Sequence, residues 1–103
     1  MHMAKELTAW ETLEAFCSAW FERRNAEEVC RFLGDEFCFV GTGEDEFAHS
    51  PQEMREYLIR DIQEIPEPFM VELTLFQEQE INADIRNLSV GMVLKNTQYR
   101  WRL

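Results

Sequence analysis

Apolar residues in the first third of the chain recur every three or four positions, the spacing of one face of an α-helix. The series is Trp10, Leu13, Phe16, Cys17, Trp20 and Phe21. Thr8 and Glu11 just before it have the spacing of a capping box, which satisfies two backbone amides at a helix N-terminus. Asn25 and Glu28 repeat that spacing and predict a short second helix, for which Gly34 is the expected C-terminal stop.

A β-strand is predicted over residues 37–40, where Phe, Cys, Phe and Val follow one another. Four consecutive apolar residues are typical of a strand covered on both faces. Gly41 and Gly43 flank Thr42 and predict a turn with positive φ. Residues 47–49 are expected to return as a short second strand.

A third helix is predicted to begin at Ser50, which has the residue type of an N-cap. Pro51 suits the first helical position, and Glu53 completes a capping box. The apolar residues that follow fall on one side of this helix and end before Pro66, which stops it. They are Met54, Tyr57, Leu58, Ile62 and Ile65.

From Phe69 onward apolar residues alternate with polar ones, as in half-buried strands. The alternation predicts three antiparallel strands in residues 69–75, 83–94 and 99–103, with a turn at 96–97. The apolar face changes near Asn87, so we expect a bulge there. Helices come mainly first and strands last, which predicts an α+β fold with helices on one face of a curved sheet.

The composition adds constraints on partners. A chain of 103 residues forms one domain, and 46% apolar residues support a packed core. Twenty acidic and ten basic residues give a formal charge of −10. Such a surface repels phosphate backbones and anionic membranes, so we expect neither nucleic acid nor membrane as a partner.

The three cysteines, Cys17, Cys30 and Cys38, are an odd number without a close pair. This favours buried free thiols in a reducing compartment, and with no signal peptide it predicts a cytoplasmic location. No His or Cys spacing fits zinc, and residues 41–43 lack the rest of a phosphate loop. No metal or cofactor is expected.

Three passages resemble the nuclear transport factor 2-like superfamily, and its small SnoaL-like domains in particular. Residues 20–28 resemble its first helix running into the second. Residues 35–46, with Gly-Thr-Gly followed by Glu, resemble its first strand and turn. Residues 50–54, with Arg60 and Asp61 downstream, resemble its third helix.

The resemblance implies a cone-shaped α+β fold, in which a curved antiparallel sheet packs against the N-terminal helices and the third helix. Residues 1–103 would form one SnoaL-like domain that dimerises through the sheet. Family members usually continue with more sheet, so either the last strand is short or this domain belongs to a longer protein, which we favour. Such domains often stand beside signalling modules in bacterial proteins.

The resemblance also implies a pocket between sheet and helices for a small apolar ligand. We expect its wall to come from the aromatic helix face and the sheet, with a few polar contacts. The expected ligand-binding residues are Phe16, Trp20, Phe39, Thr42, His49, Tyr57, Val90, Met92 and Trp101. Core packing is the commoner explanation of the aromatic helix face, and the wall of a ligand pocket is the alternative.

Enzymes of the superfamily use a carboxylate or histidine as general base, and Asp45 and His49 are the candidates here. Both also fit a solvated turn, and Asp45 lies between two glutamates. Asp61 is expected to form a local ion pair or surface contact, and Asp84 faces pocket or water. We find no full isomerase set.

The sequence therefore favours a non-catalytic small-molecule-binding or sensory module. A cyclase- or isomerase-type enzyme with Asp45 or His49 as base is the alternative. A purely structural dimerisation domain is the third hypothesis.

Overall fold

The computed structural model describes residues 7–41, 44 and 46–103. The chain has an α+β fold with antiparallel sheets. This confirms the predicted class. The elements follow in the order α1 (Ala9–Cys17), η1 (Ser18–Glu22), α2 (Ala26–Cys30), β1 (Phe39–Val40), β2 (Phe47–Ala48), α3 (Pro51–Glu64), β3 (Met70–Glu80), β4 (Arg86–Lys95) and β5 (Arg100–Arg102).

The predicted helix starts are confirmed. Thr8 forms a full capping box with Glu11, in which each side chain binds the other residue's backbone amide. The side chain of Asn25 accepts from a backbone amide of α2, and that of Ser50 does the same for α3. The end predicted for α2 is wrong, because α2 stops at Cys30 and the expected cap Gly34 lacks a positive φ.

Helix α1 continues without a break into η1, a single π-helical turn. The amide of Arg23 donates to the carbonyl of Ser18, five residues earlier, at 2.9 Å. Arg24 then takes a positive φ of 50° and ends the helix. The wider turn and the left-handed residue turn the chain so that the Arg24 side chain points back into the protein.

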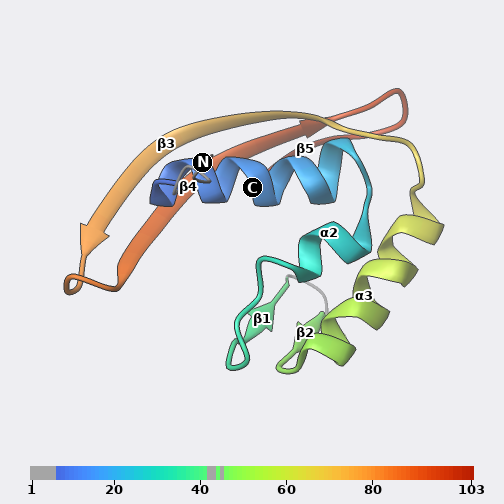
Figure 1. Ribbon diagram of the computed structural model, residues 1–103. Helices are drawn as coiled ribbons and strands as arrows, with labels where there is room; N and C mark the ends of the chain where they lie inside the picture. Colours follow the sequence, from blue (N-terminus) through green and yellow to red (C-terminus); the bar gives the residue numbers. More distant parts are fainter. Residues whose placement is uncertain (1–6, 42–43, 45) are drawn as a thin grey trace, which may run out of the picture.

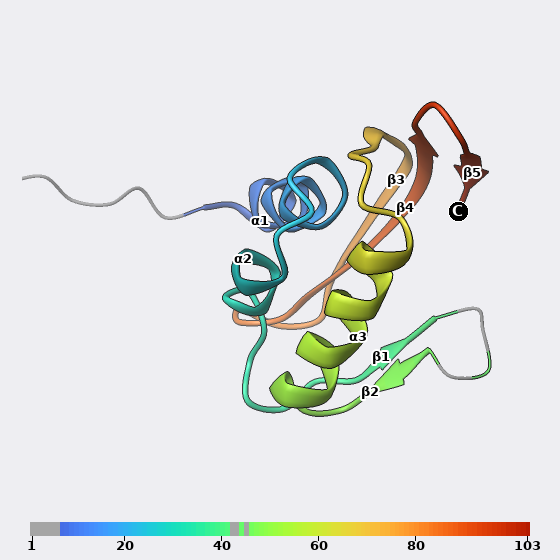
Figure 2. The same ribbon diagram turned by 90° about the vertical axis from the view of Figure 1, so that its right-hand side faces the viewer.

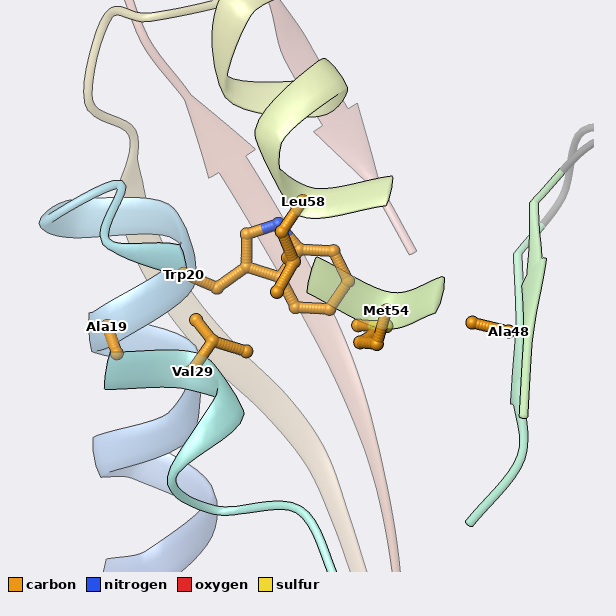
Figure 3. Packing of buried hydrophobic residues seen from close by; sticks show 6 residues of the cluster. All are labelled: Ala19, Trp20, Val29, Ala48, Met54 and Leu58. Carbon is orange, nitrogen blue, oxygen red and sulfur yellow. The ribbon is translucent and has the colours of Figure 1, made fainter. Parts of the chain in front are cut away.

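The core lies where η1, α2 and α3 meet. Figure 3 shows Val29, Met54 and Leu58 near the Trp20 side chain, with Ala19 and Ala48 at the two sides of the cluster. The cluster consists of Ala19, Trp20, Val29, Ala48, Met54 and Leu58. The predicted inward residues of the third helix are confirmed for Met54 and Leu58, which are about fully buried.

The first hairpin, β1–β2, is shorter and more exposed than the sequence predicts. Cys38 is exposed and 70% of Val40 is exposed, so the expectation of a strand covered on both faces is wrong. The amide of Gly41 donates to the carbonyl of Glu46 at 2.6 Å, and a side chain at Gly41 would collide with that of Glu46. Gly41 is thus needed for close approach, and not for a positive φ, which it lacks.

The second sheet has the order β3-β4-β5, as the alternating pattern predicts. Its two strand edges, on β3 and β5, have no neighbouring strand among the described residues. The turn before β5 is held by Asn96, whose side-chain oxygen accepts the amides of Gln98 and Tyr99. The turn is tied back to the loop after α3 by Thr97, which binds the carboxylate of Glu67.

The bulge lies in β3 and not near Asn87, so its predicted place is wrong. The register shifts between Thr74 and Gln77, and Leu75 takes a φ of 52°. This turns the Leu75 side chain outward, where 82% of it is exposed. Gly91 lies opposite, and a side chain there would come within 2.6 Å of the Thr74 hydroxyl.

Figures 1 and 2 show the long β3–β4 hairpin arching over α1, with α2, α3 and the β1–β2 hairpin below its other end. We call the side of the sheet toward α1 and η1 its inner face. Trp10 of α1 marks this face by packing on Phe76 at 5.2 Å and donating to Glu78 at 3.2 Å. The opposite side is the outer face.

Candidate functional site

The aromatic residues predicted to line a pocket form a packed cluster around Trp20 at the junction of η1, α3 and β1. Only 7% of Trp20 is exposed. Its ring lies 4.8 Å from that of Phe21, between centroids, in a stacked arrangement. Three further rings, those of Phe16, Phe39 and Tyr57, lie 5.8, 5.6 and 6.3 Å away. The rings thus fill the space between these elements with one another.

Arg24 lies beside this cluster and joins three elements. Its guanidinium donates to the carbonyl of Trp20 at the end of η1, and to those of Asp61 and Ile65 at the end of α3. It also pairs with the Asp61 carboxylate at 3.1 Å and lies 5.5 Å from the centroid of the Phe69 ring. Only 5% of the Arg24 side chain is exposed. A cation at two helix C-termini is favourably placed against both helix dipoles.

Asp61 completes this arrangement from α3. One of its carboxylate oxygens accepts the indole N–H of Trp20 at 3.0 Å and the Arg24 guanidinium. The expected local pair with Arg60 is therefore wrong, because Asp61 binds residues about forty positions earlier. With two donors on the carboxylate, this geometry holds Asp61 in a structural role.

A cavity of about 200 Å³ opens next to Tyr57, lined also by Glu46, Arg60, Asp61 and Glu64. Burial and the nearby carboxylates of Glu46 and Asp61 raise the pKa of Tyr57 to about 12, and a hydrogen bond to Glu46 acts in the same direction. Tyr57 is therefore a neutral hydrogen-bond donor at physiological pH. The lining is charged, unlike the apolar pocket that the sequence predicts.

The structure places none of the predicted bases beside the Trp20 cluster among the residues that it describes. Thr42 and Asp45 lie outside the described residues. The His49 side chain is 63% exposed, lies 3.4 Å from the Glu53 carboxylate and packs on Phe47. His49 is thus a surface residue at the start of α3, away from an apolar environment. Asp84 lies exposed in the β3–β4 turn, where its amide binds Asn82.

The predicted sheet residues of the pocket share the inner face of the sheet. Val90 and Met92 on β4 are half-buried, and Trp101 on β5 packs on Phe69 at 5.3 Å. Phe69 in turn contacts Phe21, so a chain of rings connects Trp101 to the Trp20 cluster. The structure does not bring Trp101 into direct ring contact with Trp20.

The cysteines and acidic residues offer little chemistry. All three cysteines are free, as predicted, but only Cys17 is buried and Cys38 is exposed. Burial raises the pKa of the Cys17 thiol to about 11, so this thiol stays protonated. No three His, Cys, Asp or Glu side chains of the described part lie close enough to hold a metal ion.

Sequence reasoning missed Arg24, although Trp20, Asp61 and Phe69 were all noticed. Arg24 follows Arg23 at the end of the first helix, where any cation is favourable near the C-terminus, so residue type does not separate the two. The signal that separates the two neighbours is the positive φ of Arg24, which no residue pattern encodes. Arg23 instead binds the nearby Glu28 and Ser18 on the surface.

No helix in the described ranges is long and apolar enough to cross a membrane. Comparison of the chain with family models, curated proteins and solved structures finds no match to any of them.

Proposed function

We propose that this chain is a non-catalytic association domain that pairs with a second copy of itself through the outer face of its sheet, at the end near the β3–β4 turn. The observation that carries the proposal is a surface without charged strand residues on a strongly acidic protein. We call it the hairpin face. It comprises Leu75, Gln77, Gln79, Ile81, Ile85, Asn87 and Ser89, all of which are exposed.

Charge is segregated along this hairpin. Between residues 75 and 89 the charged strand residues lie on the inner face, where Arg86 pairs with Glu78 at 3.2 Å and with Glu80 at 3.8 Å. Glu72 and Lys95, nearer the other end of the hairpin, lie on the outer face. The hairpin face presents amides, a hydroxyl and aliphatic groups. Two copies that each carry a formal charge of −10 repel one another. A surface free of carboxylates is where the two copies can approach with the least repulsion.

The same proposal includes the cone-shaped nuclear transport factor 2-like fold of the SnoaL type. It is supported by the order of two helices, a short hairpin, a third helix, two long strands and a short last strand, with α1 and η1 on the inner face of the sheet. As a domain of this kind it would act beside a signalling module in the bacterial cytoplasm. Three free cysteines are consistent with a reducing compartment.

We leave catalysis and a small apolar ligand out of this proposal. Four of the aromatic residues expected around such a ligand, Phe16, Trp20, Phe39 and Tyr57, pack against one another with ring centroids 5.0–6.3 Å apart. The candidate base His49 is 63% exposed, and general-base catalysis needs a group with a tuned pKa facing the substrate.

Sedimentation equilibrium tests the association. We expect the protein to form dimers at concentrations of about 100 μM or below, and Gln79→Glu to weaken the dimer about tenfold, because the two-fold axis brings the new charges together. Gln52→Glu is the matched control, since Gln52 is exposed on α3. Added salt should strengthen the wild-type dimer by screening repulsion. A monomer at millimolar concentration, or equal effects of the two substitutions, would refute the proposal.

A further inference from the structure

Three cations without partners gather at the β5 end of the outer face. They are Lys95, Arg100 and Arg102, all exposed, with Lys95 directly opposite Arg100 across the strand pair. Within the described part of the chain none of the three forms an ion pair. By contrast, Arg24 and Arg86 each bind carboxylates. A group of unpaired cations on a chain of net charge −10 is an electrostatic match for an acidic partner.

The backbone of the same strand has free hydrogen-bonding groups. Met92 and Leu103 exchange both of their backbone hydrogen bonds, at 2.7 and 2.8 Å, and the amide of Asn96 donates to the carbonyl of Tyr99. Hydrogen-bonded pairs alternate along an antiparallel ladder, so residues 99, 101 and 103 face β4. The N–H and C=O groups of Arg100 and Arg102 therefore point outward from the open edge of the sheet.

The inner face of this edge is apolar and partly uncovered. Tyr99 and Trp101 pack on each other at 5.1 Å, yet 41% and 38% of these residues remain exposed. Leu103, on the same face, is 57% exposed. The β5 edge thus combines free backbone hydrogen-bonding groups with cations on its outer face and apolar side chains on its inner face.

We propose that the β5 edge binds an extended acidic segment of another protein, which adds to the sheet as a fourth strand. In such a strand alternate side chains lie on opposite faces. Glutamates at every second position then lie beside Arg100 and Arg102, and the apolar residues between them lie beside Trp101. The recognised pattern is an alternation of acidic and apolar residues over about five positions.

A second copy of this chain is a poor occupant of the same edge. In an antiparallel pair of two β5 strands centred on Trp101, Arg100 of each copy would face Arg102 of the other. Like charges directly opposite one another destabilise a strand pair. A phosphate polyanion would match the cations but would leave the outward backbone groups and the apolar residues unused. The proposal is independent of the dimer proposed above, which uses the hairpin face.

The test uses a fluorescein-labelled peptide of sequence Val-Glu-Val-Glu-Val, blocked at both ends, and the full chain. Fluorescence anisotropy should show binding that weakens as salt is raised. The double variant Arg100→Glu/Arg102→Glu should bind at least about tenfold more weakly. Arg31→Glu/Arg60→Glu is the control of equal charge change, because both arginines are exposed and form no ion pair with a described residue. It should bind as the wild type does.

Amide hydrogen exchange distinguishes strand addition from simple charge attraction. On peptide binding, the amides of Arg100 and Arg102 should gain protection, while those on the free edge of β3 should not change. The Lys analogue Val-Lys-Val-Lys-Val should not bind. Three results would overturn the proposal: equal loss of binding in the two double variants, no new protection at Arg100 and Arg102, or displacement of the peptide by oligothymidylate with the same protection pattern.

Discussion

The centre of the molecule and the outer half of the β3–β4 hairpin are stabilised in different ways. At the centre, Arg24, Trp20 and Asp61 connect η1 to α3 through hydrogen bonds between residues about forty positions apart. In the hairpin, most contacts are within the strand pair, with further contacts to α1 such as those of Trp10 with Phe76 and Glu78. The centre therefore specifies the tertiary structure, whereas the hairpin presents a surface.

The same contrast separates structural from interacting residues. The aromatic side chains Phe16, Trp20, Phe39 and Tyr57, expected to line a pocket, pack together at the centre, and Asp61 is paired there with Arg24. The surfaces without partners lie on the sheet, in residues that seemed to be ordinary strand positions. The surfaces available to bind another protein are thus on the sheet.

Matched leucine substitutions, one at the centre and one in the hairpin, are expected to give the largest difference in stability. Leu58→Ala should lower the free energy of unfolding by about 3–4 kcal/mol, because it leaves a cavity in a fully buried site. Leu75→Ala should change it by less than about 0.5 kcal/mol, since 82% of Leu75 is exposed. Urea denaturation measures both. Similar losses in the two variants would show that the hairpin is as tightly packed as the centre.

Matched arginine substitutions give the next largest effect. Arg24→Ala should cost about 2–3 kcal/mol, because it removes hydrogen bonds to three carbonyls and leaves Asp61 without its cation. Arg86→Ala removes exposed ion pairs only and should cost less than about 1 kcal/mol. Equal thermal stabilities of the two variants would contradict the structural role of Arg24.

The ionisation of Tyr57 gives the smallest effect. Its pKa is raised to about 12 in the folded protein, above the ordinary value of 10. The unfolded chain therefore loses this proton first, and the stability contributed by the neutral phenol is present below pH 10 and lost as the pH rises toward 12. Stability measured by denaturation from pH 9 to 12 should fall less steeply in Tyr57→Phe. An unchanged slope would mean that Tyr57 titrates alike in both states.

Local signals in the sequence predicted the elements well. The caps at Thr8, Asn25 and Ser50 are each confirmed, because a capping side chain and its amide lie within three residues of one another. The bulge was misplaced, because the positive φ of Leu75 depends on how β3 pairs with β4 on either side of the bulge and on the space at Gly91. The alternation of apolar and polar residues along β4 suggested a bulge in that strand, whereas the register shift lies in its partner β3.

The site was harder to predict than the fold. Trp20, Phe39 and Tyr57 were expected to meet, and they do, but apolar spacing cannot distinguish the wall of a pocket from a packed core. That difference depends on how much space the rings leave between them. The uncharged hairpin face also needs the register of β3 and β4, because shifting one strand by one residue would exchange its two faces.

The sequence alone determined where the helices begin, the α+β class and the acidic charge, since each depends on neighbouring residues or on composition. Only the tertiary structure decided that Arg24 is buried and Arg23 exposed, and that Asp61 binds Trp20. It also decided that the hairpin face carries no charged strand residue, whereas three cations lie together at the β5 edge. These features depend on contacts between residues far apart in the sequence, and small differences in backbone angles decide which groups come into contact.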